Sequence, residues 1–380
     1  MVAPKLIFLV TEDWYFCSHR LPVARAAHDA GFTVGVATRV REHGEAIRAE
    51  GFALHPLRWK RRGGGLLGGL RAIVEITRLY RRERPDVVYH VALKAALFGA
   101  LAARLAFPWA ARPAIVSAVM GFGSSAAAPW RRRVLGRALR FAAGRGANIV
   151  QNAEDRAALI GFGFEPARVA LIRGSGVDTV HFAVEPPPTG GVVALVGRML
   201  RSKGVLDAAA AVRALRAEGL DVALILAGGA DPDSADSLSE VELATLGREP
   251  GIEWLGQVGD VRDVWRRAAI ALLPSSYGEG VPKALLEAAS CGRPIIASDM
   301  PGCRDVVVDG ETGLLVPVGD VAALTAAIRS LVGDPERRAR MGAAGRARAL
   351  REFAEERVAE QTLALLRLAL AGGGRGGSKR

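Results

Sequence analysis

Residues 269–291 read AIALLPSSYGEGVPKALLEAASC. The first five residues predict an apolar strand, the loop that follows contains two glycines, and a helix is expected to begin near Pro282. Proline suits the first position of a helix because that position needs no N–H donor. In an open parallel sheet, ligands bind at the carboxyl ends of the strands. The stretch therefore predicts an α/β sheet with a ligand-binding loop at the end of this strand.

Two carboxylates in this stretch stand eight residues apart, Glu279 in the loop and Glu287 in the helix. Carboxylates accept hydrogen bonds from hydroxyl groups, which sugars and riboses present. The helix N-terminus favours an anion, because its free amides and the positive end of its dipole face the loop. The alternative is a solvated surface helix that carries two unrelated acids.

A second candidate site lies upstream, where residues 194–204 read ALVGRMLRSKG. An apolar strand ends at Gly197, Arg198 follows it, and Lys203 comes five residues later. An arginine fork and a lysine point charge at one strand end can hold a diphosphate. Either cation alone would be better explained as solvated surface charge, but the two together at the predicted sheet edge favour a binding role.

Working outward, short apolar strands alternate with helical patterns through both halves of the chain. The strands are expected at 5–10, 33–37, 86–90, 114–118, 147–151, 192–196, 222–227, 252–255, 269–273, 294–297 and 313–316. Near-continuous apolar strands separated by helices are typical of buried parallel sheets. The pattern predicts two successive doubly wound α/β domains.

Domain boundaries are expected from the Gly- and Pro-rich segments. We assign 1–175 to a first domain, 176–352 to a second, 353–371 to a C-terminal helix that returns to the first domain, and 372–380 to a disordered tail. At 380 residues the chain is long enough for two such domains. The Asp231-Pro232-Asp233 segment matches a metal motif in form, but its turn-forming neighbours indicate a loop, and no metal or other cofactor is expected.

Charge is distributed unevenly along the chain. Residues 1–180 contain 27 Lys and Arg against 13 Asp and Glu, whereas residues 181–380 contain 24 against 26. This imbalance predicts an anionic partner for the first half alone. The three scattered cysteines show neither metal spacing nor a disulfide framework. With no apparent signal peptide or spanning segment, a cytoplasmic location is expected.

These motifs together resemble the GT-B-fold retaining glycosyltransferases of family 4. The E-x7-E motif reads Glu279…Glu287 and the GR…KG pair reads Arg198…Lys203. The resemblance also rests on Gly176-Val177-Asp178…Phe182 and on a closing signature from Pro301 to Pro317, and so covers nearly all of the second domain.

The resemblance implies roles for residues of the second domain. Glu279 would contact the donor sugar and Glu287 the ribose, while Arg198 and Lys203 would bind the diphosphate and stabilise the leaving group. These roles make Glu279, Arg198 and Lys203 the expected catalytic residues. The other expected donor contacts are Gly197, Gly256, Ser275, Gly280 and Val281.

The first domain resembles the family less closely. Asp13, His19 and Arg20 are similar to a D-x-x-F-x-x-H-R variant, and Ser18 is expected to cap the following helix, leaving His19 and Arg20 at its positive end beside a phosphate. A packed His19 and a solvated Arg20 are the alternative. Relatives often carry a T-x-H-G histidine, which is missing here, and His90 is expected to be packed instead of replacing it.

Two basic stretches each contain a tryptophan, as in a protein that meets anionic headgroups. The first contains Trp59, Lys60, Arg61 and Arg62, and the second contains Trp130, Arg131, Arg132 and Arg133. A solvated basic face is the alternative for each stretch. Nucleic acid is not expected as a partner, because no recognised binding module is present.

The expected function is retaining transfer of a sugar from a nucleotide diphosphate sugar, expected to be a UDP-sugar, in cell-surface polysaccharide biosynthesis. The acceptor would be a saccharide or lipid-linked sugar at the cytoplasmic face of the inner membrane. A nucleotide-sugar epimerase of the same architecture and a non-catalytic membrane-binding homologue are the alternatives.

Overall fold

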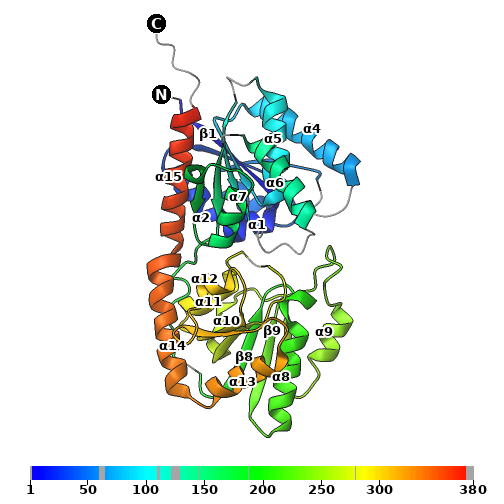
Figure 1. Ribbon diagram of the computed structural model, residues 1–380, viewed down its shortest axis with the longest axis vertical. Coiled ribbons are helices and arrows are strands. Elements are labelled where there is room, and N and C mark those ends of the chain that lie inside the picture. The colour runs from blue at the N-terminus through cyan, green and yellow to red at the C-terminus, as the bar shows by residue number, and fades with distance from the viewer. Residues whose placement is uncertain are drawn as a thin grey trace. The chain divides into compact units, whose positions relative to one another are not determined.

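The computed structural model describes residues 2–59, 65–108, 112–120, 129–144, 146–186, 188–278 and 280–373. The chain divides into two units (Figure 1). The first unit combines Met1–Ser175 with Glu356–Arg380, and the second contains Gly176–Glu355. Each unit is built around one sheet, and the predicted fold class of two doubly wound α/β domains is confirmed.

The first unit contains a seven-stranded sheet whose paired strands are all parallel, in the order β3-β2-β1-β4-β5-β6-β7. Its strands are β1 Lys5–Glu12, β2 Thr33–Arg39, β3 Ala53–Pro56, β4 Val87–Val91, β5 Ala114–Ala118, β6 Ala147–Val150 and β7 Val169–Leu171. Its helical segments are α1 Asp13–His19, α2 Leu21–Asp29, α3 Gly44–Ala49, α4 Gly65–Glu83, α5 Leu93–Ala106, α6 Pro129–Ala143, α7 Ala153–Gly161 and the short η2 Pro166–Arg168.

Strand β1 shows why the strands of this sheet read as continuous apolar runs. Leu6 and Phe8 pack into one core cluster, whereas Ile7 and Leu9 pack into a second cluster on the other face. Helices cover both faces of the sheet, so both sets of side chains are withdrawn from water.

The second unit contains a six-stranded parallel sheet in the order β10-β9-β8-β11-β12-β13. Its strands are β8 Gly191–Val196, β9 Val222–Ala227, β10 Ile252–Gly256, β11 Ile270–Leu273, β12 Ile295–Ser298 and β13 Gly313–Val316. Its helical segments are η3 Arg201–Lys203, α8 Val205–Ala217, α9 Glu240–Leu246, α10 Arg262–Arg267, α11 Lys283–Ser290, α12 Cys303–Val306, α13 Val321–Val332, α14 Pro335–Arg348 and η4 Ala349–Phe353.

The last helix, α15 (Glu355–Gly373), begins two residues later than predicted. Val358, Ala359 and Leu366 pack into the core of the first unit. The two places where the chain passes between the units are neighbours, because the Val177 N–H donates to the Phe353 carbonyl and the Glu355 N–H to the Val177 carbonyl. Among the described residues, none of the helices is both long and apolar enough to cross a membrane.

Candidate functional site

Three neighbouring strands of the second sheet end on glycines with positive φ angles. Gly197, Gly228 and Gly256 follow or close β8, β9 and β10, with φ of +148°, +146° and +66°. A Cβ on Gly228 would lie only 1.7 Å from the Gly197 carbonyl oxygen, and the Gly228 N–H donates to the Gly256 carbonyl at 2.7 Å. The main chain at this edge therefore carries no side chains, which lets a ligand approach the backbone closely. Sequence reasoning selected Gly197 and Gly256 but missed Gly228, whose signal is the Gly-Gly pair after β9.

Arg198 follows directly on this glycine edge. Its Nη1 donates to Asp231 Oδ2 at 2.6 Å, and its side chain stays about half exposed. Asp231 belongs to the D-x-D segment. One carboxylate of that segment therefore positions Arg198, the residue predicted to bind the diphosphate. Within the described ranges, no three His, Cys, Asp or Glu side chains gather in the manner of metal ligands.

The loop that carries Lys203 is fastened to the loop that follows β11. The Ser276 N–H and the Ser275 hydroxyl both donate to the Ser202 carbonyl, at 2.8 and 3.0 Å. Gly204 lies against the chain beside them, since a Cβ there would be 2.1 Å from the Pro274 carbonyl oxygen. These contacts hold the two predicted donor-binding segments, the loop after β8 and the loop after β11, together. Ser275 is buried and holds the two loops together. The sequence predicted a donor contact for this residue but not this structural role.

The helix after this loop begins one residue later than predicted. Pro282 is the N-terminal cap of α11, with an extended ψ of 119°, and Lys283 is the first helical residue. Pro282 is therefore not at the first helical position. Val281 turns its side chain into the core, and Gly280 is half-buried. Glu279 lies outside the described residues.

Glu287 is mostly buried on the second turn of α11. Its Oε1 lies 4.0 Å from Lys283 Nζ. Burial raises the pKa of Glu287 to about 7, against a smaller opposing effect of the Lys283 charge. The carboxyl group therefore changes charge near neutral pH.

This pKa predicts a stability effect with a definite sign. Folding raises the affinity of Glu287 for its proton, so the folded state loses stability as the pH rises from about 4.5 to about 7. At pH 8 we expect Glu287→Gln to have a free energy of unfolding up to about 3 kcal/mol higher than the wild type. Urea unfolding would measure this difference. The difference should shrink toward pH 5. A gain of the same size at both pH values would contradict the raised pKa.

In the first unit, Asp13 is fully buried at the start of α1. Its carboxylate accepts backbone N–H groups of Trp14, Arg41 and His43 at 2.7 to 2.9 Å. The residue joins the start of α1 to the segment after β2. Its predicted contact with an acceptor or phosphate is therefore replaced by a role in shaping the loop.

His19 and Arg20 lie at the junction of two helices, because α1 already covers Asp13–His19. Ser18 does not cap a helix as predicted; its hydroxyl lies 2.6 Å from His19 Nδ1. The His19 ring stacks on Tyr15. Arg20 is only 2% exposed, and its Nη2 lies 3.4 Å from the Met120 sulfur. None of the described carboxylates forms an ion pair with Arg20. Arg20 is thus a buried cation near the carboxyl ends of the strands of the first sheet, which we call the strand-end edge.

Sequence reasoning missed two charged residues at the same edge. Glu12 is buried at the end of β1, with Arg39 Nη1 at 3.6 Å and Arg41 Nε at 3.3 Å. Lys94, in the first turn of α5, has its pKa lowered by burial and raised by the charge of Glu12. The available signal was an acidic residue at the end of a buried strand, where ligands bind.

The two basic stretches with a tryptophan have different surroundings. Trp59 is 4% exposed, and its ring packs near Phe98 and under the Lys94 ammonium. The prediction that Trp59 lies on the surface is wrong, because this ring closes the core beneath α5. Lys60, Arg61 and Arg62 lie outside the described residues, as does the side chain of Arg131. Trp130, Arg132 and Arg133 belong to α6, where Trp130 is 62% exposed.

The prediction that His90 is packed is confirmed. His90 is fully buried, with Nε2 3.0 Å from the Tyr80 hydroxyl and Nδ1 3.3 Å from Ser117 Oγ. Burial lowers its pKa to about 3, so the ring is neutral at physiological pH. The residue stabilises the core of the first unit and does not replace a catalytic histidine.

The chain matches known protein families through both of its units. Residues 5–143 match a family model described as Glycosyl transferase 4-like, and residues 190–334 match one described as Glycosyl transferases group 1. The chain belongs to this family of glycosyltransferases. The resemblance drawn from the motifs is thereby confirmed, and the two-unit architecture is the GT-B fold.

Among curated relatives, this glycosyltransferase is 35% identical to alpha-maltose-1-phosphate synthase from Mycolicibacterium smegmatis over 227 residues, 53% of this chain and 57% of that protein. It is 26% identical to the capsular polysaccharide biosynthesis glycosyltransferase CapM from Staphylococcus aureus, over 45% of this chain and 44% of CapM. The chain therefore spans about half the length of these curated relatives, 57% of the first and 44% of CapM.

Among solved structures, the glycosyltransferase resembles HepE from Anabaena in complex with UDP and glucose. The TM-score is 0.77 at 19% identity, and the match covers 96% of this chain and 99% of that one. At this identity the likeness shows the fold alone.

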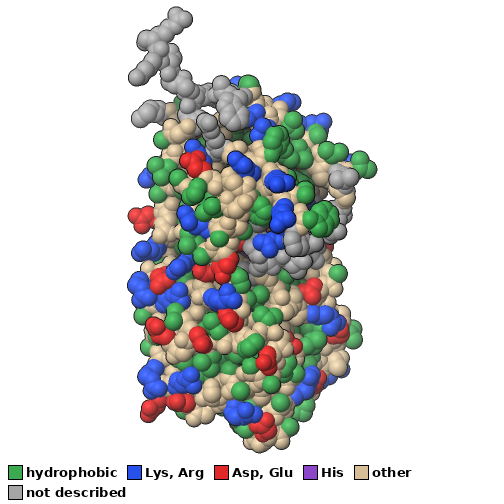
Figure 2. Space-filling view, in the orientation of Figure 1, with side chains coloured by type: hydrophobic (Ala, Val, Ile, Leu, Met, Phe, Trp, Pro, Cys, Tyr) green, Lys and Arg blue, Asp and Glu red, His purple; other side chains and the backbone are tan. Residues whose placement is uncertain are grey.

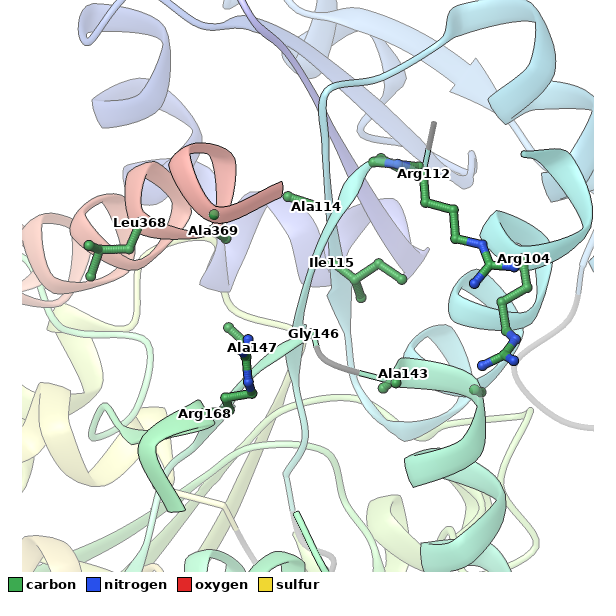
Figure 3. A pocket seen from close by; sticks show the side chains of 14 residues that line it. Arg104, Arg112, Ala114, Ile115, Ala143, Gly146, Ala147, Arg168, Leu368 and Ala369 are labelled. Atoms are coloured by element: carbon green, nitrogen blue, oxygen red, sulfur yellow. The ribbon is translucent and has the colours of Figure 1, made fainter. Parts of the chain in front are cut away.

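A pocket of about 410 Å³ lies in the first unit (Figure 3). Its lining includes Arg112 and Ala114 at the start of β5, Ala147 at the start of β6, and Leu368 of α15. The pocket therefore lies at the opposite end of the strands from Glu12. Its lining includes none of the predicted site residues, so it gives no support to the donor or acceptor assignments.

Proposed function

We propose that this glycosyltransferase moves a sugar from a UDP-sugar to a lipid-linked or saccharide acceptor in cell-surface polysaccharide biosynthesis, with retention of anomeric configuration. The observation that carries the proposal is the glycine edge of β8, β9 and β10, with Arg198 and the Lys203 loop beside it. That arrangement offers bare backbone and two cations to a nucleotide diphosphate.

On the donor side, the proposed reaction breaks the bond between the anomeric carbon and the diphosphate oxygen. The acceptor oxygen bonds to the same carbon from the same face, and its proton passes to the leaving phosphate. Arg198 and Lys203 would offset the negative charge that develops on the diphosphate, so that no metal is required. Glu287 would accept the ribose hydroxyls. The binding of UDP by HepE supports the choice of nucleotide.

On the acceptor side, the buried cation of Arg20 supports a phosphorylated acceptor. No described carboxylate pairs with this charge, and the phosphate of an acceptor would supply the negative charge. The excess of Lys and Arg in residues 1–180 favours the same kind of partner. The similarity to CapM, a capsular polysaccharide biosynthesis glycosyltransferase, supports a role in polysaccharide assembly.

The test is nucleotide release from a panel of UDP-, GDP- and ADP-sugars, with and without a crude lipid-linked saccharide fraction. We expect UDP release from one sugar only when acceptor is present, with the sugar recovered in the lipid fraction. Conversion of a UDP-sugar to its epimer without acceptor would favour the epimerase instead. If none of the nucleotide sugars binds, both enzyme functions are excluded and a non-catalytic homologue is favoured.

A further inference from the structure

Exposed apolar side chains gather on three neighbouring helices of the first unit. Helix α5 contacts both α4 and α6. Of the eighteen large hydrophobic side chains exposed in the described part of the chain, seven lie on these helices: Leu67, Leu70, Val74, Leu105, Trp130, Val134 and Phe141. We call this surface the α4–α6 face. Soluble proteins rarely expose so many large apolar side chains together without a binding partner.

The charged side chains exposed on this face are arginines. Arg71 and Arg78 are exposed on α4, and Arg133, Arg137 and Arg140 are exposed on α6. Helices α5 and α6 contain no acidic residue, and the Glu75 carboxylate of α4 accepts the Arg58 N–H. Figure 2 shows the same pattern, with hydrophobic and basic side chains and no acidic ones over these helices.

The exposed side chains of α6 follow helical spacing. Trp130, Val134, Arg137 and Phe141 come three or four positions apart and so lie along one side of the helix. At the other end of this stripe, the Arg104 guanidinium lies over the Phe141 ring at 4.3 Å and donates to the Phe141 carbonyl, which fixes α6 against α5. A helix that exposes aromatic, aliphatic and arginine side chains together is suited to lie in the headgroup layer of a membrane.

Charge decides between the occupants that could cover the face. In a two-fold dimer the same surface meets itself, so arginines would oppose arginines without acidic partners. An anionic bilayer satisfies both features, because phosphates meet the guanidinium groups while the apolar side chains enter the headgroup layer.

We infer that the α4–α6 face docks this glycosyltransferase on an anionic lipid bilayer. Helices α5 and α6 follow β4 and β5 in the chain, so Trp130 and Val134 in the first turns of α6 lie at the strand-end edge that carries Glu12 and Arg20. Docking would place that edge beside a lipid-linked acceptor. The inference rests on the proposed function for its purpose, whereas its test needs neither donor nor acceptor.

The test is co-sedimentation of the full chain with sucrose-loaded vesicles of phosphatidylcholine alone or with 30% phosphatidylglycerol. We expect the wild type to prefer the anionic vesicles and to be released by high salt. Reversing two charges in Arg133→Glu with Arg137→Glu should weaken partitioning about 30-fold. Trp130→Ser with Val134→Ser should weaken it about 10-fold or more.

The matched control carries Val241→Ser with Arg340→Glu, two exposed positions of the second unit. It should partition like the wild type, and unchanged thermal unfolding of all three variants would show that each is folded. Equal vesicle binding by the wild type and both α6 variants would overturn the inference. A dimer that Trp130→Ser with Val134→Ser dissociates, without vesicle binding, would assign the face to a second copy. Vesicle binding without sugar transfer would overturn the proposed function alone.

Discussion

Lys203→Ala is expected to lower kcat about 100- to 1000-fold with saturating UDP-sugar and acceptor. Lys203 ends the short η3 helix next to the glycine edge, where the proposed diphosphate would lie. Removing one preorganised group that stabilises developing charge typically costs this much in the transition state. The change should affect kcat more than the KM for the donor, because the leaving diphosphate is more negative in the transition state than in the bound donor. Initial rates of UDP release would measure both constants.

Arg201→Ala is the matched control for this experiment. Arg201 lies in the same helical turn but pairs with Glu242 on the surface. We expect its kcat to stay within about twofold of the wild type, because exposed ion pairs contribute little. The contacts of Ser202 with Ser275 and Ser276 are unaffected by either change, so the loop should keep its place. A kcat for Lys203→Ala close to that of Arg201→Ala would remove Lys203 from the proposed mechanism.

Much of the fold could be predicted because its strands are buried on both faces. Strand β1 packs alternate residues into two different core clusters, so the sequence there must be apolar at successive positions. Strands β3 and β7 were missed because they are short and lie at the edges of the first sheet. β3 ends in Pro56, and β7 has only three residues. Such edge strands are determined by pairing with a neighbour, which leaves little local pattern.

The candidate site was predictable where it depends on backbone and charge, and less so where it depends on distant contacts. Gly197 and Arg198 follow directly from their place at the end of a strand. Ser275 binds the carbonyl of Ser202, 73 residues away, and no local spacing could indicate that contact. Trp59 reads as a surface residue because basic residues follow it, yet Lys94 and Phe98 of helix α5 pack against its ring. Tertiary packing decides these cases.

Gly228→Ala is expected to destabilise the second unit by about 3 kcal/mol or more. The residue has a φ of +146°, which L-amino acids rarely adopt, and the added Cβ would lie 1.7 Å from the Gly197 carbonyl oxygen. Backbone strain and overpacking each cost about 1–3 kcal/mol. Urea unfolding followed by tryptophan fluorescence suits this measurement, because the Trp254 indole N–H donates to the Gly228 carbonyl at 2.9 Å.

Gly256→Ala separates the two causes of that loss. Gly256 closes the neighbouring strand with a φ of +66°, but a Cβ there would meet no atom within 4 Å. We expect it to cost about 1–2 kcal/mol, from the left-handed conformation alone. If Gly228→Ala costs no more than Gly256→Ala, the Gly197 carbonyl must be able to move aside. The segment that carries Arg198 and Lys203 would then yield under small perturbations, and the preorganisation from which the large effect of Lys203→Ala is expected would be lost.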